Sequence, residues 1–295
     1  MRLVQVLLLG VGLLCGQAAA AAELPQRWVS AGGALSEWIV AFGAEDRLVA
    51  VDSTSQHPQS LRQLPVIGYQ RALSAEGILA LHPDILIGSE EMGPPPVLEQ
   101  LRAAGVQVET LSARAELQVL EANLLRLGEL LGEPQRARTL LNDYRQGLQR
   151  QAERVAAAQR EQAPPRVLML LGQGGGNLLA AGRDSLAVWL IERAGGRSGV
   201  EHRGYKAISS EAILALDPQV LIVADRALHG EAAHRALLRH NPVLAQTSAG
   251  RSGRLVSLDP TLLVGGLGPR LPEGLAELAT AFYPSAHALT AEVDR

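Results

Sequence analysis

Two short segments of the chain place a tyrosine next to a cationic side chain. Tyr69 lies two residues before Arg71, and Tyr205 lies directly before Lys206, the single lysine of the sequence. A phenolate is a hard anionic donor that suits ferric iron, and a neighbouring cation favours the ionised form. An isolated phenol ionises near pH 10, so a phenolate at neutral pH needs the metal and the cation to stabilise it. The positions of these residues in the sequence fit equally well a structure in which the tyrosines pack at the rim of a domain and Lys206 is exposed to solvent.

The two tyrosines open two copies of one sequence pattern. When Glu76 is aligned with Glu211, eight of the twelve positions from the glutamate onward are identical. Ser74 and Ser209 are predicted helix N-caps, so each glutamate falls in a first helical turn, where a negative charge suits the helix dipole. Two related lobes that face each other form a cleft, and such clefts are common ligand sites.

The elements that must position these residues alternate between strands and helices, which predicts a parallel α/β architecture in each lobe. A long helical region at 115–162 separates the two alternating regions, and it is interrupted at Gly132-Glu133-Pro134. We expect it to join the lobes. The predicted strands are 28–30, 47–51, 85–87, 106–111, 167–171, 220–223 and 254–258, and the other predicted helices are 34–42, 97–104, 184–194, 231–239 and 272–282.

Composition and the N-terminus bound the class of protein. The chain has 295 residues, is 47% hydrophobic and carries a formal net charge of −3, which argues against a nucleic-acid-binding protein. Arg2, an apolar run at 3–14 and the alanine-rich segment 18–22 have the pattern of a cleavable secretory signal peptide. The one cysteine, Cys15, lies within this predicted signal peptide. We therefore expect a periplasmic protein without disulfides.

Several blocks of the sequence resemble one known family. Residues 52–55 (DSTS) and 64–77 (LPVIGYQRALSAEG) look like the signature of periplasmic haem-binding proteins of bacterial haem ABC importers. Residues 180–184, 203–206 and 267–273 resemble the same family, so the likeness covers almost the whole chain after the signal. It implies a class III periplasmic binding protein with two Rossmann-like lobes joined by a single long helix. The implied domains are 1–22 (signal peptide), 23–132 (first lobe), 133–163 (linking helix) and 164–295 (second lobe).

The resemblance also implies roles for particular residues. Tyr69 would be the axial ligand of the haem iron, and Arg71 would hydrogen-bond the phenolate or a propionate. Tyr205 would be a second ligand, a stacking wall or a hydrogen-bond partner, and Lys206 would pair with a propionate. Glu76 and Glu211 would dock onto the inner-membrane ABC permease. The implied ligand is haem b as cargo, and the implied partners are the permease and its ATPase, with a monomeric carrier.

Other ligands and activities are compatible with parts of the sequence. A carrier for a ferric siderophore or a corrinoid would share the same fold, and only the block around Tyr69 favours haem. The glycine-rich loop 172–177 lacks the last glycine of a dinucleotide-binding fingerprint. The seven histidines, among them His57, His82, His229 and His234, form no evident zinc or manganese set. An enzyme acting in the cleft would need a nucleophile in a recognisable setting, and none is apparent.

Overall fold

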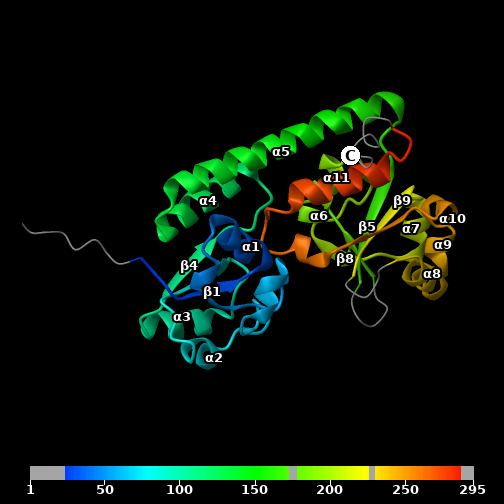
Figure 1. The fold of residues 1–295 in the computed structure, drawn as a ribbon. Helices are drawn as coiled ribbons and strands as arrows, with labels where there is room; N and C mark the ends of the chain where they lie inside the picture. Colours follow the sequence, from blue (N-terminus) through cyan, green and yellow to red (C-terminus); the bar gives the residue numbers. More distant parts are fainter. Residues whose placement is uncertain (1–23, 173–177, 226–229, 287–295) are drawn as a thin grey trace, which may run out of the picture.

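The structure, a computed structural model, describes residues 24–172, 178–225 and 230–286. These residues form two α/β lobes beneath one long helix (Figure 1). This arrangement confirms the predicted fold class. The predicted signal peptide, the glycine-rich segment 173–177 and His229 lie outside the described residues.

The first lobe is built on a four-stranded parallel sheet with the order β2-β1-β3-β4. Its strands β1 and β3 are buried along their whole length, as expected for the apolar central strands of a sheet covered on both faces. The strands are β1 (Trp28–Ala31), β2 (Leu48–Val51), β3 (Ile85–Ser89) and β4 (Gln107–Leu111), and the helices are α1 (Gly33–Phe42), α2 (Ala75–Leu79), α3 (Pro95–Ala103) and α4 (Leu117–Leu131), with 3-10 turns at Glu45–Arg47 and Gln59–Gln63.

The second lobe has a mixed sheet with the order β10-β9-β5-β6-β8. The parallel part, β10-β9-β5, matches the prediction, whereas the antiparallel strands β6 and β8 were not predicted. Five residues connect β5 to β6, too few for the crossover that a parallel pair requires. The strands are β5 (Arg166–Gly172), β6 (Leu178–Ala181), β7 (Arg197–Ser198), β8 (Tyr205–Ala207), β9 (Val220–Ala224) and β10 (Leu255–Leu258). The helices are α6 (Leu186–Arg193), α7 (Ser210–Leu216), α8 (Gly230–His240), α9 (Pro242–Ala245), α10 (Ser248–Ser252) and α11 (Leu271–Phe282), with a 3-10 turn at Pro260–Leu263.

Helix α5 (Pro134–Glu161) runs along both lobes (Figure 1). It is separated from α4 by Gly132, whose φ of 77° ends α4 in the left-handed conformation that glycine adopts without strain. Pro134 then starts α5, because its missing N–H costs nothing in the first turn. In the first lobe, the buried Tyr144 of α5 meets Trp38 of α1 with ring centroids 5.7 Å apart. Farther along, α5 packs against α11, so one continuous helix supports both lobes.

The sequence repeat corresponds to a structural repeat. The Ser74 hydroxyl accepts a hydrogen bond from the Gly77 N–H at the start of α2, and the Ser209 hydroxyl does the same for the Ala212 N–H at the start of α7. Both predicted N-caps are therefore confirmed. The repeat extends to contacts that cap the other ends of these helices.

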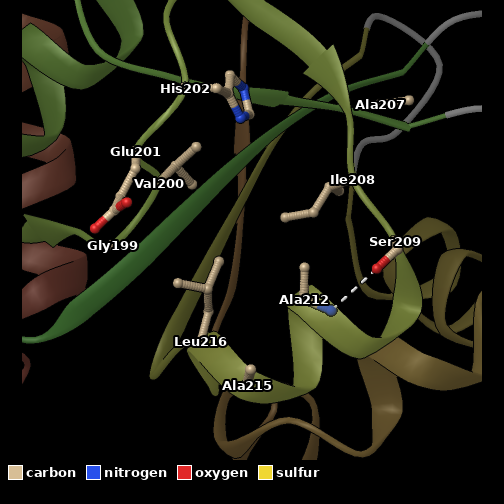
Figure 2. Close-up of a pocket in the computed structure, with 10 residues that line it drawn as sticks. All are labelled: Gly199, Val200, Glu201, His202, Ala207, Ile208, Ser209, Ala212, Ala215 and Leu216. Carbon is tan, nitrogen blue, oxygen red and sulfur yellow. Dashed lines mark hydrogen bonds between the residues drawn. The ribbon is translucent and has the colours of Figure 1, made fainter.

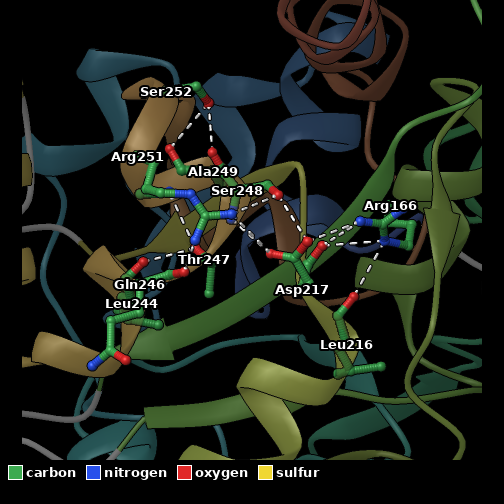
Figure 3. A network of polar contacts seen from close by, with 11 residues as sticks. Arg166, Leu216, Asp217, Leu244, Gln246, Thr247, Ser248, Ala249, Arg251 and Ser252 are labelled. Carbon is green, nitrogen blue, oxygen red and sulfur yellow. Dashed lines mark hydrogen bonds and ion pairs between the residues drawn. The ribbon is translucent and has the colours of Figure 1, made fainter.

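In each lobe, an arginine at the start of the first strand donates hydrogen bonds to the end of the repeated helix. Arg27 donates to the carbonyl oxygens of Leu81 and His82, and Arg166 donates to the equivalent carbonyl oxygens of Leu216 and Asp217. His82 and Asp217 both have positive φ, 49° and 35°. In the second lobe the Asp217 carboxylate also accepts hydrogen bonds from the backbone and hydroxyl of Ser248, as Figure 3 shows.

The chain after β10 returns to the first lobe and joins the two lobes through charged groups. Arg270 Nη2 lies 2.7 Å from Glu37 Oε1 of α1, and Arg270 Nη1 lies 3.4 Å from Asp259 Oδ2. His57 Nε2 lies 2.7 Å from the same Asp259 oxygen. The Trp38 indole adds a 2.8 Å hydrogen bond to the Leu267 carbonyl oxygen. These contacts restrain the lobes relative to each other.

Loss of the arginine in this junction should destabilise the fold. Burial raises the pKa of Glu37 even with Arg270 beside it, and a charged hydrogen bond of this kind stabilises a fold by about 2 kcal/mol. We expect Arg270→Met to lower the free energy of unfolding by about that amount in urea titration. The exposed Arg138 of α5 provides the matched control, Arg138→Met. Equal free energies of unfolding for the two variants would contradict a stabilising junction.

Candidate functional site

Tyr69 lies in the segment between β2 and α2. The light-blue part of this segment is on the side of the first lobe toward the second lobe (Figure 1). The segment is anchored to β2 by hydrogen bonds from the Val51 N–H to the Pro65 carbonyl and from the Ile67 N–H to the Val51 carbonyl. Gly68 then turns the chain with a φ of 91°, a conformation that favours glycine. Tyr69 is 45% exposed, so the residue is accessible to a ligand.

A buried polar network holds the base of this segment. The Asp52 carboxylate accepts hydrogen bonds from the hydroxyls of Thr54 and Ser55 and from the Gly32 N–H. The Thr54 hydroxyl in turn accepts from the Gly33 N–H at the start of α1. Residues 52–55, which carry part of the family resemblance, therefore have a structural role here: they fix the loop after β2 to the start of α1.

Arg71 is held by a carboxylate that the sequence did not reveal. Its Nη2 lies 2.5 Å from Glu91 Oε1, and this hydrogen bond is the main reason that the pKa of Arg71 is raised. Tyr69 contributes to the same rise through its electrostatic interaction with Arg71. Tyr69 and Arg71 lie two residues apart in the same loop. Glu91 has no recognisable motif around it, because only the fold brings it to Arg71.

Tyr205 of β8 is partly buried in the second lobe and packs against the main hydrophobic core. Burial raises the pKa of its phenol, hydrogen bonds with Ser185 and the Ala187 backbone oppose this rise, and the Glu91 carboxylate adds to it. The Glu91 carboxylate belongs to the first lobe, so a charge of that lobe acts on the pKa of a phenol in the second lobe. These surroundings favour the protonated phenol at Tyr205.

Lys206 does not share the surroundings of Tyr205. The two residues are neighbours in strand β8, and successive side chains of a strand point to opposite faces of the sheet. Lys206 is exposed, whereas Tyr205 is partly buried. The structure thus separates two residues that the sequence grouped.

A cavity of about 510 Å³ lies between the lobes, and Tyr205 is not among the residues that line it. Ser185, which interacts with the Tyr205 phenol, is part of its wall. The wall carries both signs of charge, with Arg114 and Glu116 from the segment before α4 on one side. On the other side are the start and outer face of α6 and the turn before it, contributing Arg183, Asp184, Ser185, Val188, Trp189 and Glu192.

A second cavity, of about 390 Å³, lies within the second lobe rather than between the lobes (Figure 2). Val200, Ile208 and Leu216 form an apolar wall beside α7, and Glu201 and His202 lie at one side. None of the residues predicted to bind a ligand lines it. It adjoins the first turn of α7 through Ser209 and Ala212.

Glu76 and Glu211 are exposed in the first turns of α2 and α7. The pKa of Glu211 is lowered by its own backbone N–H and by the Ser209 hydroxyl. The carboxylate of Glu211 is therefore ionised at neutral pH, and the hydrogen-bonding groups at the start of α7 orient it. Because the two glutamates occupy equivalent positions in the repeat, each lobe has an exposed carboxylate at the start of the equivalent helix.

Among the residues that the structure describes, no group of three or more histidine, cysteine, aspartate or glutamate side chains is placed to hold a metal ion. No helix within the described ranges is long and apolar enough to cross a membrane.

Known proteins are similar to this chain over most of its length. The family described as periplasmic binding protein matches residues 29–262. A periplasmic haem-binding protein from Pseudomonas aeruginosa superposes with a TM-score of 0.86 at 64% identity, covering 89% of this chain and 94% of that chain. A periplasmic haem-binding protein of Vibrio cholerae superposes with a TM-score of 0.76 at 36% identity, covering 88% and 99%. A vitamin B12-binding protein of Yersinia pestis is 26% identical over 225 residues, 76% of each chain.

Proposed function

Because the chain belongs to the periplasmic binding protein family, we propose that it captures haem between its two lobes and delivers it to an inner-membrane ABC permease. The observation that carries this proposal is the exposed Tyr69, two residues before Arg71 in the same loop, in a chain 64% identical to a periplasmic haem-binding protein. Haem is cargo here, and the carrier performs no chemistry on it. Membership of this family supports a periplasmic location, and residues 1–22 would be the cleavable signal that sends the protein there.

Each residue of the site has a role in this proposal. Tyr69 as phenolate coordinates ferric iron, and Arg71 stabilises the negative charge on its oxygen. Tyr205 remains protonated and contributes a hydrogen-bond donor or an apolar wall from the second lobe. Lys206, exposed on the other face of β8, is free to approach a propionate only at the edge of the cleft. The lobes and linking helix would comprise residues 23–132, 164–295 and 133–163.

Delivery requires a contact with the permease, whose transport is driven by its ATPase. Glu76 and Glu211 offer one exposed carboxylate on each lobe, suited to a cationic side chain on each of two permease subunits. A monomeric carrier would present both carboxylates at once.

Titration of the purified protein with ferric haem tests the proposed ligand. We expect a saturable complex with the absorption of an iron–phenolate bond, and weaker binding of a corrinoid such as cyanocobalamin or of a ferric siderophore in competition. The exposed phenol favours haem because cobalamin brings its own axial ligands and gains little from a hard anionic donor. Absence of a saturable haem complex, or tighter binding of cobalamin, would overturn the proposal.

A further inference from the structure

We propose that Glu91 is a positioning residue of this site: its carboxylate holds the Arg71 guanidinium beside Tyr69, so that Arg71 serves the phenolate rather than a propionate of the ligand. The inference rests on the proposed haem-binding function and adds a residue to it. Glu91 lies just after strand β3, 20 residues from Arg71 in the chain.

The two oxygens of the Glu91 carboxylate hold two consecutive residues of the Tyr69 loop. Oε1 accepts from Arg71 at 2.5 Å, and Oε2 accepts from the side-chain amide of Gln70 at 3.2 Å. Gln70 is 1% exposed, so this second contact is buried at its donor end. Since both oxygens are engaged, the carboxylate has a defined orientation.

The backbone reinforces the same pairing of segments. The Gly93 N–H donates to the Gln70 carbonyl oxygen at 2.9 Å, and the Leu73 N–H donates to the Gly93 carbonyl oxygen at 2.8 Å. The Glu91 N–H donates to the Ser89 hydroxyl at 3.2 Å. The turn after β3 and the loop that carries Tyr69 therefore form one unit, with Glu91 and Arg71 at its exposed edge.

Pairing with Glu91 changes what Arg71 can do. The ion pair has little net charge, so its long-range attraction for an anionic propionate is small. The guanidinium has five N–H donors, and those not used by Glu91 remain free to donate to the phenolate oxygen of Tyr69, which lies two residues before Arg71 in the same loop. Arg71 can therefore still hydrogen-bond a nearby oxygen, although Glu91 cancels its attraction for a distant propionate. This is why we infer that Arg71 serves Tyr69.

The variant Glu91→Ala separates positioning from charge. If only the charge of Glu91 mattered, its removal would favour an anionic ligand and should tighten haem binding. Loss of the support for Arg71 should weaken it, and we expect about tenfold weaker binding, since partners that orient a metal ligand typically contribute 10–100-fold. The matched control is Glu90→Ala, which removes the neighbouring carboxylate, bonded to Ser112 and Ala113 instead of Arg71, and should leave haem affinity within about twofold.

A double-mutant cycle completes the test. If Glu91 acts through Arg71, the double variant Arg71→Ala/Glu91→Ala should bind haem no more weakly than Arg71→Ala, and both should shift the iron–phenolate absorption alike. Glu91→Gln, which retains one acceptor oxygen, should recover part of the affinity. Wild-type-like or tighter binding by Glu91→Ala, or additive losses, would overturn the inference. Absence of haem binding by the wild-type protein would instead count against the proposed function.

Discussion

Tyr69→Ala should remove the iron–phenolate absorption of the haem complex and weaken haem binding by about a hundredfold or more. Partners that only orient a metal ligand contribute 10–100-fold to affinity, so loss of the ligand itself should cost at least the upper value. Tyr69 is 45% exposed, so removal of its ring leaves no cavity in the core. The folded state should therefore remain intact, and haem titration followed by absorption spectroscopy measures the loss directly.

Two phenylalanine variants are the matched controls for this result. Tyr69→Phe retains the ring and removes only the oxygen, so it should resemble Tyr69→Ala in its absorption spectrum. Tyr205→Phe removes the second phenol, which its surroundings keep protonated, and should retain the iron–phenolate absorption with less than about tenfold loss of affinity. If the absorption disappears with Tyr205→Phe and persists with Tyr69→Phe, the two tyrosines have the opposite roles.

The double charge reversal Glu76→Lys/Glu211→Lys should abolish haem transport and leave haem binding unchanged. Both carboxylates are exposed at helix starts, and like charges placed opposite each other at an interface cost several kcal/mol. Haem-dependent growth of cells that contain the cognate permease measures transport, and haem titration of the purified variant measures binding.

The control for this experiment must reproduce the change in net charge. Glu99 of α3 and Glu153 of α5 are also exposed, one in the first lobe and one on the linking helix. Their double reversal to lysine should leave transport close to that of the wild-type protein. Transport that survives reversal of Glu76 and Glu211, or that is lost equally in the control, would contradict a docking role.

Local sequence signals predicted much of the fold. The serines that cap α2 and α7, the break between α4 and α5 at Gly132 and the repeated apolar runs were all readable, because capping, glycine conformation and periodicity act over a few residues. The antiparallel strands β6 and β8 were not readable. They are short, and their pairing depends on a five-residue connection and on the sheet they join.

The candidate site divides in the same way. The sequence by itself determined that Tyr69 and Arg71 are neighbours, because only Gln70 separates them in the chain. Only the tertiary structure decided that Glu91 joins them from 20 residues away, and that Glu37 meets Arg270 across 233 residues. It also separated Tyr205 from Lys206, because adjacent residues of a strand face opposite sides of the sheet. Contacts within a turn follow from the local backbone, whereas contacts between lobes exist only once the two cores have formed and been placed along α5.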